Sequence, residues 1–279
     1  MNASVRAPAI AGWRAELSLV YAARGRRTVP IQRSHYGPLL VQKALYPEAE
    51  VCHHIIVHPP AGMAGGDSLT LIAKLEENAA VLMTTPGATK WYRAPHAAAQ
   101  QALQFNLAAG ASLEWLPQEN IYFDHANVDS MIEVNLAAGA YFIGWDIACF
   151  GRQAANENFA SGRVFNRFRI RAQQRLLWQE RALYRAGDAL FTSPIGLGGK
   201  RVCGVCVLAG ERVNRSMLEH ARALSAPGGA ALTLLPGVLL IRYLGDSAEA
   251  AQKFFRAVWQ ALRPELLGRA AITPRIWST

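Results

Sequence analysis

The stretches FNLAAGASLEW (residues 105–115) and VNLAAGAYFIGW (residues 134–145) share the five residues Asn-Leu-Ala-Ala-Gly at a separation of 29 positions. In each copy an alternating apolar segment precedes the glycine, and a second apolar segment ending at a tryptophan follows it. Related strand-turn-strand patterns lie at residues 71–87, with a turn at Asn78, and at residues 168–180, with a turn at Gln173 and Gln174. Four such units, about 29 to 34 residues apart, predict a β-helix-like body of stacked sheets.

The alternation inside these units has a period of two residues, which is typical of strands. In QALQFNL (residues 101–107), Leu103, Phe105 and Leu107 share one face, and the polar residues between them lie on the other. The connections at Gly110 and Gly139 are too short to hold the helix that a βαβ unit requires. This pattern argues against a Rossmann-type or P-loop fold.

The helices are expected late in the chain. RSMLEHARALS (residues 215–225) has a helical apolar face. A second helix is predicted after Ser247, which is a suitable N-cap, and its apolar face continues until a break expected before Pro264. Between them GVLLIRYLG (residues 237–245) predicts a buried strand. The fold class is therefore mainly β with a small α/β C-terminal portion, in a single domain over residues 1–279. Its β-rich body covers about 10–205, and its helix-strand-helix tail about 206–279.

Composition restricts the class of protein. The chain has 279 residues, is 51% hydrophobic and carries a net charge of +9 that is spread along its length. A dispersed surplus favours a solvated surface over a nucleic-acid stripe, although a basic nucleic-acid binder with salt-dependent affinity stays an alternative. The sequence predicts neither a signal peptide nor a membrane span, so a cytoplasmic location is expected. Four scattered cysteines do not indicate a disulfide framework.

The stretch TTPGATKWYR (residues 84–93) contains the residue types of a phosphate loop: Thr84, Thr85, Gly87, Thr89 and Lys90. A Walker loop needs G-x-x-x-x-G-K-[ST], because several backbone N–H groups must converge on the phosphates. Here a single glycine precedes the lysine, and GLGGKR (residues 196–201) fails the pattern as well. The interpretation is instead a strand end followed by a tight Pro-Gly turn, with positive φ at the glycine.

A second stretch, CHHIIVHPPAGMAGGD (residues 52–67), offers candidate metal ligands. In an extended strand Cys52, His54 and His58 face one way and His53 the other, and His54 and His58 are about 13 Å apart, too far for one ion. His53 and His54 remain candidate ligands for a transition metal such as nickel, with packing and hydrogen bonding as the favoured alternative.

Other reactive residues show no catalytic spacing. The CxxC pair at residues 203 and 206 lies in a β-type segment without a second pair, so two small buried residues are the better interpretation. Acidic residues lie in or after the repeated units, but no spacing forces two of them together: Glu114, Glu119, Asp124 and Asp146. No serine nucleophile motif and no H-E-x-x-H motif occurs.

Six blocks carry a resemblance to a known family: RSHYGPLLVQKALYPE, CHHIIVHPPAGMAGGD, LMTTPGATKWYR, LEWLPQENIYFD, GWDIACFGR and SPIGL. Their order and approximate spacing resemble the UreD (UreH) family of urease accessory proteins, from about residue 12 to the C-terminal PRIW. Members of this family are β-helical proteins with a small helical portion.

The resemblance implies a urease maturation chaperone that is not an enzyme. Its implied partners are the urease apoprotein, UreF and, through UreF, the GTPase UreG, with neither nucleic acid nor membrane. It implies no tightly bound cofactor, only transient nickel on its way to urease. A proposed internal passage for nickel would use exchangeable oxygen ligands, because thiolates or several histidines would trap the ion.

Carried onto this chain, the passage points to Asp67, Glu119 and Asp124, with the threonines at residues 84, 85 and 89 as further polar members. The alternative function is a cytosolic β-helical carbohydrate-active enzyme, which would need an open groove with two carboxylates roughly 5 to 10 Å apart.

Overall fold

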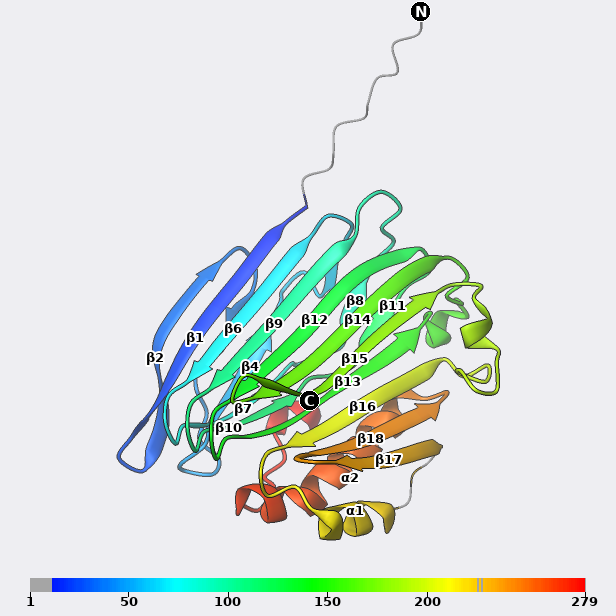
Figure 1. Ribbon diagram of the computed structural model, residues 1–279. Helices are drawn as coiled ribbons and strands as arrows, with labels where there is room; N and C mark the ends of the chain where they lie inside the picture. The colour runs from blue at the N-terminus through cyan, green and yellow to red at the C-terminus, as the bar shows by residue number, and fades with distance from the viewer. Residues whose placement is uncertain (1–11, 225, 227, 279) are drawn as a thin grey trace, which may run out of the picture.

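The computed structural model describes residues 12–224, 226 and 228–278. Within these residues the chain forms a β-solenoid of about four turns, built from a seven-stranded and an eleven-stranded sheet (Figure 1). The seven-stranded sheet contains, in spatial order, β15 (Arg175–Arg185), β14 (Gly162–Ala172), β12 (Ala126–Leu136), β9 (Ala99–Leu107), β6 (Ser68–Leu75), β1 (Arg14–Arg24) and β2 (Arg27–Tyr36).

The eleven-stranded sheet is the second wall of the solenoid. Its main path runs through β17 (Gly229–Leu235), β18 (Val238–Gly245), β16 (Val202–Ala209), β13 (Tyr141–Phe150), β10 (Ser112–Leu116), β7 (Ala80–Thr84), β4 (Cys52–Val57) and β3 (Leu40–Val41). Three short strands, β5 (Gly62–Met63), β8 (Thr89–Trp91) and β11 (Asn120–Tyr122), pair with one another and with β13. Strands β4, β7, β10 and β13 are parallel, as stacked turns of a solenoid require.

The predicted repeat is confirmed in three of the four units, where the chain passes from one sheet to the other through a short corner. Residues Asn78, Gly110 and Gly139 hold equivalent corner positions with φ of 58°, 66° and 64°. The corners stack through backbone hydrogen bonds, since the Asn78 N–H donates to Ala109 O at 3.0 Å and the Gly110 N–H to Ala138 O at 3.1 Å. A left-handed residue is needed at each corner, which explains why glycine and asparagine recur there.

The fourth unit differs from the prediction. Strands β14 and β15 form an antiparallel hairpin within the seven-stranded sheet and do not cross to the other sheet. Its two turn residues, Gln173 and Gln174, have φ of 48° and 66°. Two consecutive left-handed residues make a turn of the I′ kind, which folds a strand back on its neighbour. The hairpin therefore ends the stack of parallel turns at this side.

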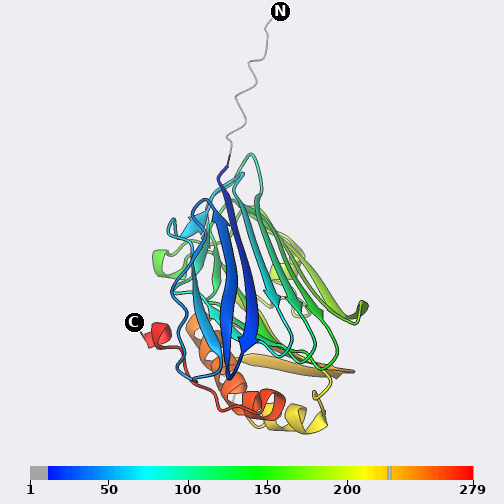
Figure 2. The same cartoon turned by 90° about the vertical axis from the view of Figure 1, so that its left-hand side faces the viewer.

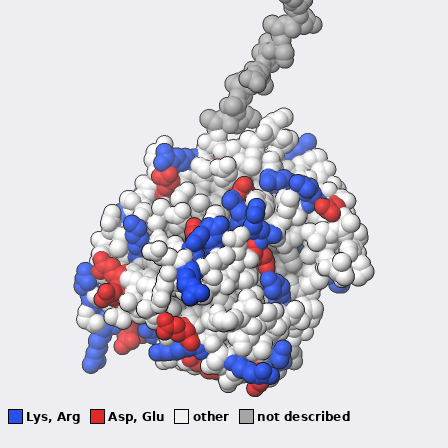
Figure 3. All heavy atoms as spheres, in the orientation of Figure 1, with Lys and Arg blue, Asp and Glu red and all other residues white. Residues whose placement is uncertain are grey.

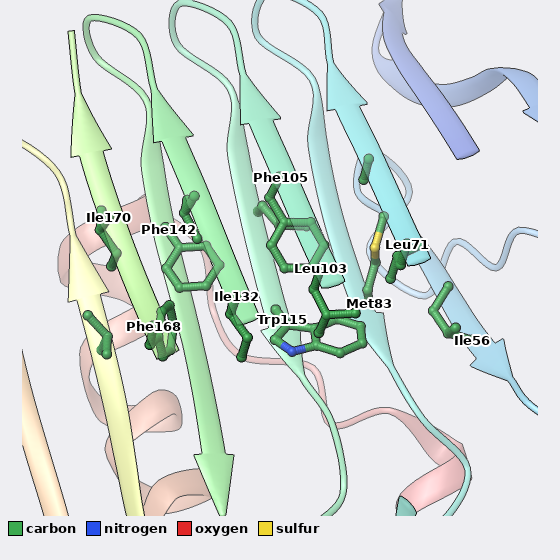
Figure 4. Packing of buried hydrophobic residues seen from close by; sticks show 14 of the residues in the cluster. Ile56, Leu71, Met83, Leu103, Phe105, Trp115, Ile132, Phe142, Phe168 and Ile170 are labelled. Atoms are coloured by element: carbon green, nitrogen blue, oxygen red, sulfur yellow. The ribbon is translucent and has the colours of Figure 1, made fainter. Parts of the chain in front are cut away.

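The interior core lies between the two sheets. Buried side chains from both walls interdigitate there, and Phe105, Phe142 and Phe168 follow one another with ring centroids 6.4 and 6.2 Å apart (Figure 4). The predicted alternation in β9 is confirmed, because Leu103, Phe105 and Leu107 are buried in this core.

A second core lies on the outer face of the eleven-stranded sheet. Helices α1 (Arg215–Arg222) and α2 (Ala248–Leu267) cover this face, and Figure 2 shows them packed beside the solenoid and outside its interior. Outward-facing Trp145 and Ile147 of β13 meet Phe255 and Trp259 of α2. The C-terminal part of the chain from Val202 on thus adds β16, β17 and β18 to the sheet and shields it with two helices.

Two details of the tail differ from the predictions. Helix α2 begins at the predicted Ser247 N-cap, whose Oγ accepts from the Ala250 N–H at 3.2 Å, but it continues through Pro264 and ends at Gly268 with φ of 68°. Proline removes one hydrogen bond of the helix, and burial of Leu266 and Leu267 outweighs that loss. Strand β17 was not predicted, because this edge strand has a largely exposed, non-alternating sequence.

Short 3-10 helices complete the structure: η1 (Gln153–Ala155), η2 (Ala189–Phe191) and η3 (Arg275–Ser278). Among the described residues, no helix has the length and apolar character needed to span a membrane.

Candidate functional site inside the solenoid

Strand β13 directs one carboxylate into the interior of the solenoid. Its side chains alternate, so that Trp145 and Ile147 face the helices while Phe142, Asp146 and Ala148 face the space between the sheets. Apolar neighbours on both sides make Asp146 the exception on an otherwise hydrophobic inner face. The stretch GWDIACFGR therefore contains a functional candidate that its sequence spacing alone did not single out.

A chain of polar groups holds the Asp146 carboxylate. Asn120 of β11 donates its Nδ2 hydrogen to Asp146 Oδ1 at 2.7 Å, and Trp91 Nε1 donates to Asn120 Oδ1 at 2.9 Å. Burial raises the pKa of Asp146 to about 6, the bond from Asn120 opposes this shift, and the negative charge of Glu180 adds to it. Asp146 consequently changes its charge close to neutral pH.

Two cavities share Asp146 in their walls. The larger measures about 640 Å³ and lies toward β14, β15 and β18, whereas the smaller measures about 170 Å³ and lies beside the loop after β7. Ile132 and Asp146 line both. Glu180, which pairs with Arg242, gives the larger cavity a second carboxylate. This arrangement offers oxygen donors in sequence along the interior.

The CxxC pair is divided between the two faces of β16. Cys203 lines the larger cavity, with Sγ 3.5 Å from the Tyr184 hydroxyl, while Cys206 belongs to the core under the helices. Burial raises the pKa of Cys203 to about 12, which keeps the thiol protonated. The two sulfurs cannot act together, and the interpretation as a small buried residue is confirmed for Cys206, whereas Cys203 is only partly buried.

The predicted histidines lie on opposite faces of β4, and each has one polar partner. His53 Nε2 is 2.6 Å from Glu48 Oε1, and His54 Nδ1 is 2.6 Å from the Tyr21 hydroxyl. Burial lowers the pKa of His54 to about 4, so this ring is neutral at pH 7. In the described part of the chain, no group of three or more His, Cys, Asp or Glu residues could hold a metal ion.

The predicted acidic residues lie in loops and do not belong to either cavity wall. Asp67 accepts backbone hydrogens from Trp13 at 2.8 Å and Ala64 at 2.7 Å, and Asp124 Oδ1 accepts from Ala160 and Ser161. Both carboxylates therefore tie neighbouring loops together. Glu119 is partly buried. Burial lowers the pKa of Arg256 and the charge of Glu119 opposes this shift, whereas burial raises the pKa of Cys149 and the charge of Glu119 adds to it.

The TTPGATKWYR stretch contributes to the smaller cavity. Thr85, Gly87 and Thr89 line it, and Thr85 Oγ1 donates to Gly87 O at 3.1 Å while accepting from the Gln118 N–H. Thr84 is buried; it donates to Leu116 O and accepts from Trp277 Nε1 at 2.8 Å. Lys90 lies on β8 between β5 and β11.

The tight turn predicted within this stretch is wrong. Residues 85–88 form an open bend between β7 and β8, and Gly87 does not have positive φ. This difference follows from the solenoid, because the chain continues around the same turn from β7 to β8 and does not reverse its direction as a tight turn would require.

A buried ionic cluster that no sequence pattern predicted lies beneath α2. Arg263 is fully buried and binds two carboxylates in fork geometry, Glu48 at 2.7 and 2.8 Å and Glu114 at 2.8 and 2.9 Å. Trp259 Nε1 also donates to Glu114, and His53 completes the set beside Glu48. These residues are separated by as many as 215 positions, so no local pattern could have indicated the cluster.

Comparisons with known proteins identify the family of this chain. The family model described as UreD urease accessory protein matches residues 14–278. A urease accessory protein UreD of Methylobacillus flagellatus is 48% identical over 282 aligned positions, covering 100% of this chain and 99% of that protein. The same named protein of Pseudomonas aeruginosa is 48% identical, and that of Azoarcus sp. is 47% identical, each covering 96% of this chain and 95% of the relative. The chain therefore belongs to the UreD family of urease accessory proteins.

Proposed function

We propose that this chain is a cytoplasmic, non-catalytic scaffold in urease maturation that assists the insertion of nickel into the urease apoprotein. Its family membership supports the role in maturation. Within that role, we assign to it binding of the urease apoprotein and of UreF, with UreG reached through UreF. The observation that carries the proposal of nickel transit is the pair of interior cavities that share Asp146.

The chemistry of the cavity walls suits passage of a divalent cation. Asp146, Asn120 and Glu180 offer oxygen donors, which bind nickel more weakly than thiolates or grouped imidazoles do. Cys203 is the exception, but its thiol is protonated at neutral pH and must lose its proton before it can bind. A wall of this kind allows an ion to move from one site to the next.

Asp146 is the proposed central site of the path. Its pKa of about 6 leaves it mainly ionised at neutral pH, while its protonation below that value would release a bound cation. Asp67, Glu119 and Asp124 remain proposed contributors at the surface, where Asp67 and Asp124 also hold the loops in shape.

The experiment is co-purification of the full chain with urease and UreF, followed by a count of nickel per urease. Asp146→Asn keeps the shape and the hydrogen bond from Asn120, and we expect it to lower the nickel content and urease activity while the complex still forms. Asp246→Asn, at an exposed residue paired with Lys200, is the matched control. Asp67→Asn tests the surface end of the path in the same assay.

Unchanged nickel and activity with Asp146→Asn would remove this residue from the path. The scaffold role has a separate test, because a deletion strain at ordinary nickel supply should contain urease protein that is poor in nickel. Active urease in that strain would contradict the role as a whole.

The carbohydrate-active alternative keeps one supporting observation, since Asp146 and Glu180 line the same cavity and one has a raised pKa. However, Glu180 is held in an ion pair with Arg242, and the relatives are named as accessory proteins. Release of reducing ends from polysaccharides by the wild-type chain, lost in Asp146→Asn, would favour the enzyme over the scaffold.

A further inference from the structure

The outer face of the β14–β15 hairpin carries a dense group of cations. Alternate residues of β14 point away from the core, and their cross-strand neighbours on β15 share that face. We call the set the arginine stripe, and it consists of Arg163, Arg167, Arg169, Arg171, Arg181 and Arg185. Figure 3 shows Lys and Arg side chains gathered in a band across this face of the molecule.

The arginine stripe places like charges next to one another, which lowers the stability of the folded chain. Arg163 stands directly opposite Arg185, and Arg167 directly opposite Arg181. Like charges in directly opposed positions destabilise a sheet. A single ring, Phe165, lies beneath three guanidinium groups at 5.1 to 5.7 Å from its centroid. The hairpin thus concentrates positive charge on one side of an edge strand.

Two carboxylates of β12 neutralise only part of the stripe. Asp129 pairs with Arg167, and Glu133 lies 3.7 Å from Arg169 and 3.5 Å from Arg171. In the described part of the chain, Arg163, Arg181 and Arg185 have no ion-pair partner. Six positive charges against two negative ones leave four in excess, so the surface is complementary to an anionic partner.

A polar groove continues the stripe at one end. It measures about 880 Å³ and is lined in part by Lys74, Asn106, Glu133, Asn135 and Arg171. Asn135 Nδ2 donates to Asn106 Oδ1 at 3.0 Å, and both amide side chains line the groove. Cations at both ends with amides between them can receive acidic and polar side chains.

The chemistry favours a protein partner over nucleic acid. Arginine binds carboxylates through two parallel hydrogen bonds, so discrete acidic side chains can each meet one free guanidinium. A phosphate backbone would instead run across Asp129 and Glu133, whose charges repel it. We propose that the arginine stripe and its groove form the docking surface for an acidic face of a protein partner. This inference rests on the proposed function in one respect, because it takes the urease apoprotein as that partner.

The test compares two variants with equal changes in charge. Arg181→Gln/Arg185→Gln removes two unpaired cations of the stripe, and Arg26→Gln/Arg222→Gln removes two exposed arginines elsewhere. Binding of the full chain to urease apoprotein is measured between low and high salt. We expect roughly tenfold weaker binding and a smaller salt dependence for the stripe variant only. Equal behaviour of the two variants would overturn the proposal.

Additional probes separate this proposal from the proposed function. Poly-L-glutamate presents carboxylates without urease, and its binding should be weakened by the stripe variant even if the wild-type chain fails to bind urease. Failure of the wild-type chain to bind urease at any salt would count against the proposed function alone. Tighter binding of a 20-base-pair DNA duplex than of poly-L-glutamate would overturn the protein assignment. If the stripe variant self-associates but keeps its affinity for urease and for poly-L-glutamate, the arginines only protect the edge strand from pairing with another chain.

Discussion

At Arg263, one guanidinium holds two buried carboxylates from segments that are distant in the chain. Burial alone would lower the pKa of Arg263, but Glu114 and Glu48 outweigh this and raise it. Burial would raise the pKa of Glu48, but its contacts with His53 and Arg263 outweigh this effect and lower it. The cluster is satisfied only as a unit, because removal of Arg263 leaves the charges of two buried carboxylates without the cation that balances them.

We therefore expect Arg263→Met to lower the free energy of unfolding by about 3–5 kcal/mol, as measured by urea denaturation. Arg215→Met, which breaks an exposed pair with Glu219, should change it by less than about 0.5 kcal/mol. Restoration of stability by adding Glu48→Gln and Glu114→Gln to Arg263→Met would support the electrostatic reason. A loss of less than 1 kcal/mol in the single variant, by the same principle, would contradict it.

The buried Asp146 carboxylate destabilises the folded state at neutral pH, because its pKa of about 6 lies above its value in an unfolded chain. Between about pH 4 and pH 6 the folded state binds more protons, so the free energy of unfolding falls as the pH rises through this window. Asp146→Asn should raise it by about 2–3 kcal/mol at pH 7, with a difference that shrinks toward pH 4. Calorimetry at several pH values checks this, and destabilisation by the variant at pH 7 would refute it.

At the scale of elements, corners and turns decide which sheet a strand joins. A single left-handed residue, as at Gly110 or Gly139, carries the chain from one wall of the solenoid to the other. Two in succession, at Gln173 and Gln174, fold it back into the same wall. The second arrangement places two glutamines in a conformation that side chains disfavour.

Replacement of Gln174 by glycine should therefore raise the free energy of unfolding by about 1 kcal/mol. Gln179→Gly, in the interior of β15, should lower it by about 0.5–1 kcal/mol, because glycine weakens a strand. Denaturant titrations of both variants measure the difference. The same loss at both positions would show that the turn at residue 174 carries no strain.

At the scale of the whole molecule, the C-terminal segment connects the helices to the solenoid wall. Trp277 of η3 donates to Thr84 of β7, and its ring lies 6.0 Å from Trp145 and 5.7 Å from Trp259. The Arg256 guanidinium lies 4.4 Å from the centroid of the same ring. One side chain thus joins β7, β13 and α2 near the end of the chain.

Loss of this side chain in Trp277→Ala should lower the free energy of unfolding by about 2–3 kcal/mol, less than for a fully buried tryptophan because the ring is half-buried. Trp13→Ala, at a residue that is 62% exposed, is the control and should have little effect. Denaturation followed by tryptophan fluorescence checks both. Similar losses in the two variants would mean that the C-terminal segment does not stabilise the fold.

By itself, the sequence determined the stacked strands, the positions of the turns between them, the Ser247 cap and the family, because period-two alternation, turn chemistry and capping act between residues close in the chain. Only the tertiary structure decided that β14 and β15 form a hairpin, that Arg263 reaches Glu48 and Glu114, and that Asp146 lies in the walls of both cavities. The Arg263 contacts alone join segments as many as 215 positions apart. Such contacts leave no local pattern, since which residues meet is set by how the turns of the solenoid stack and where the last helix packs.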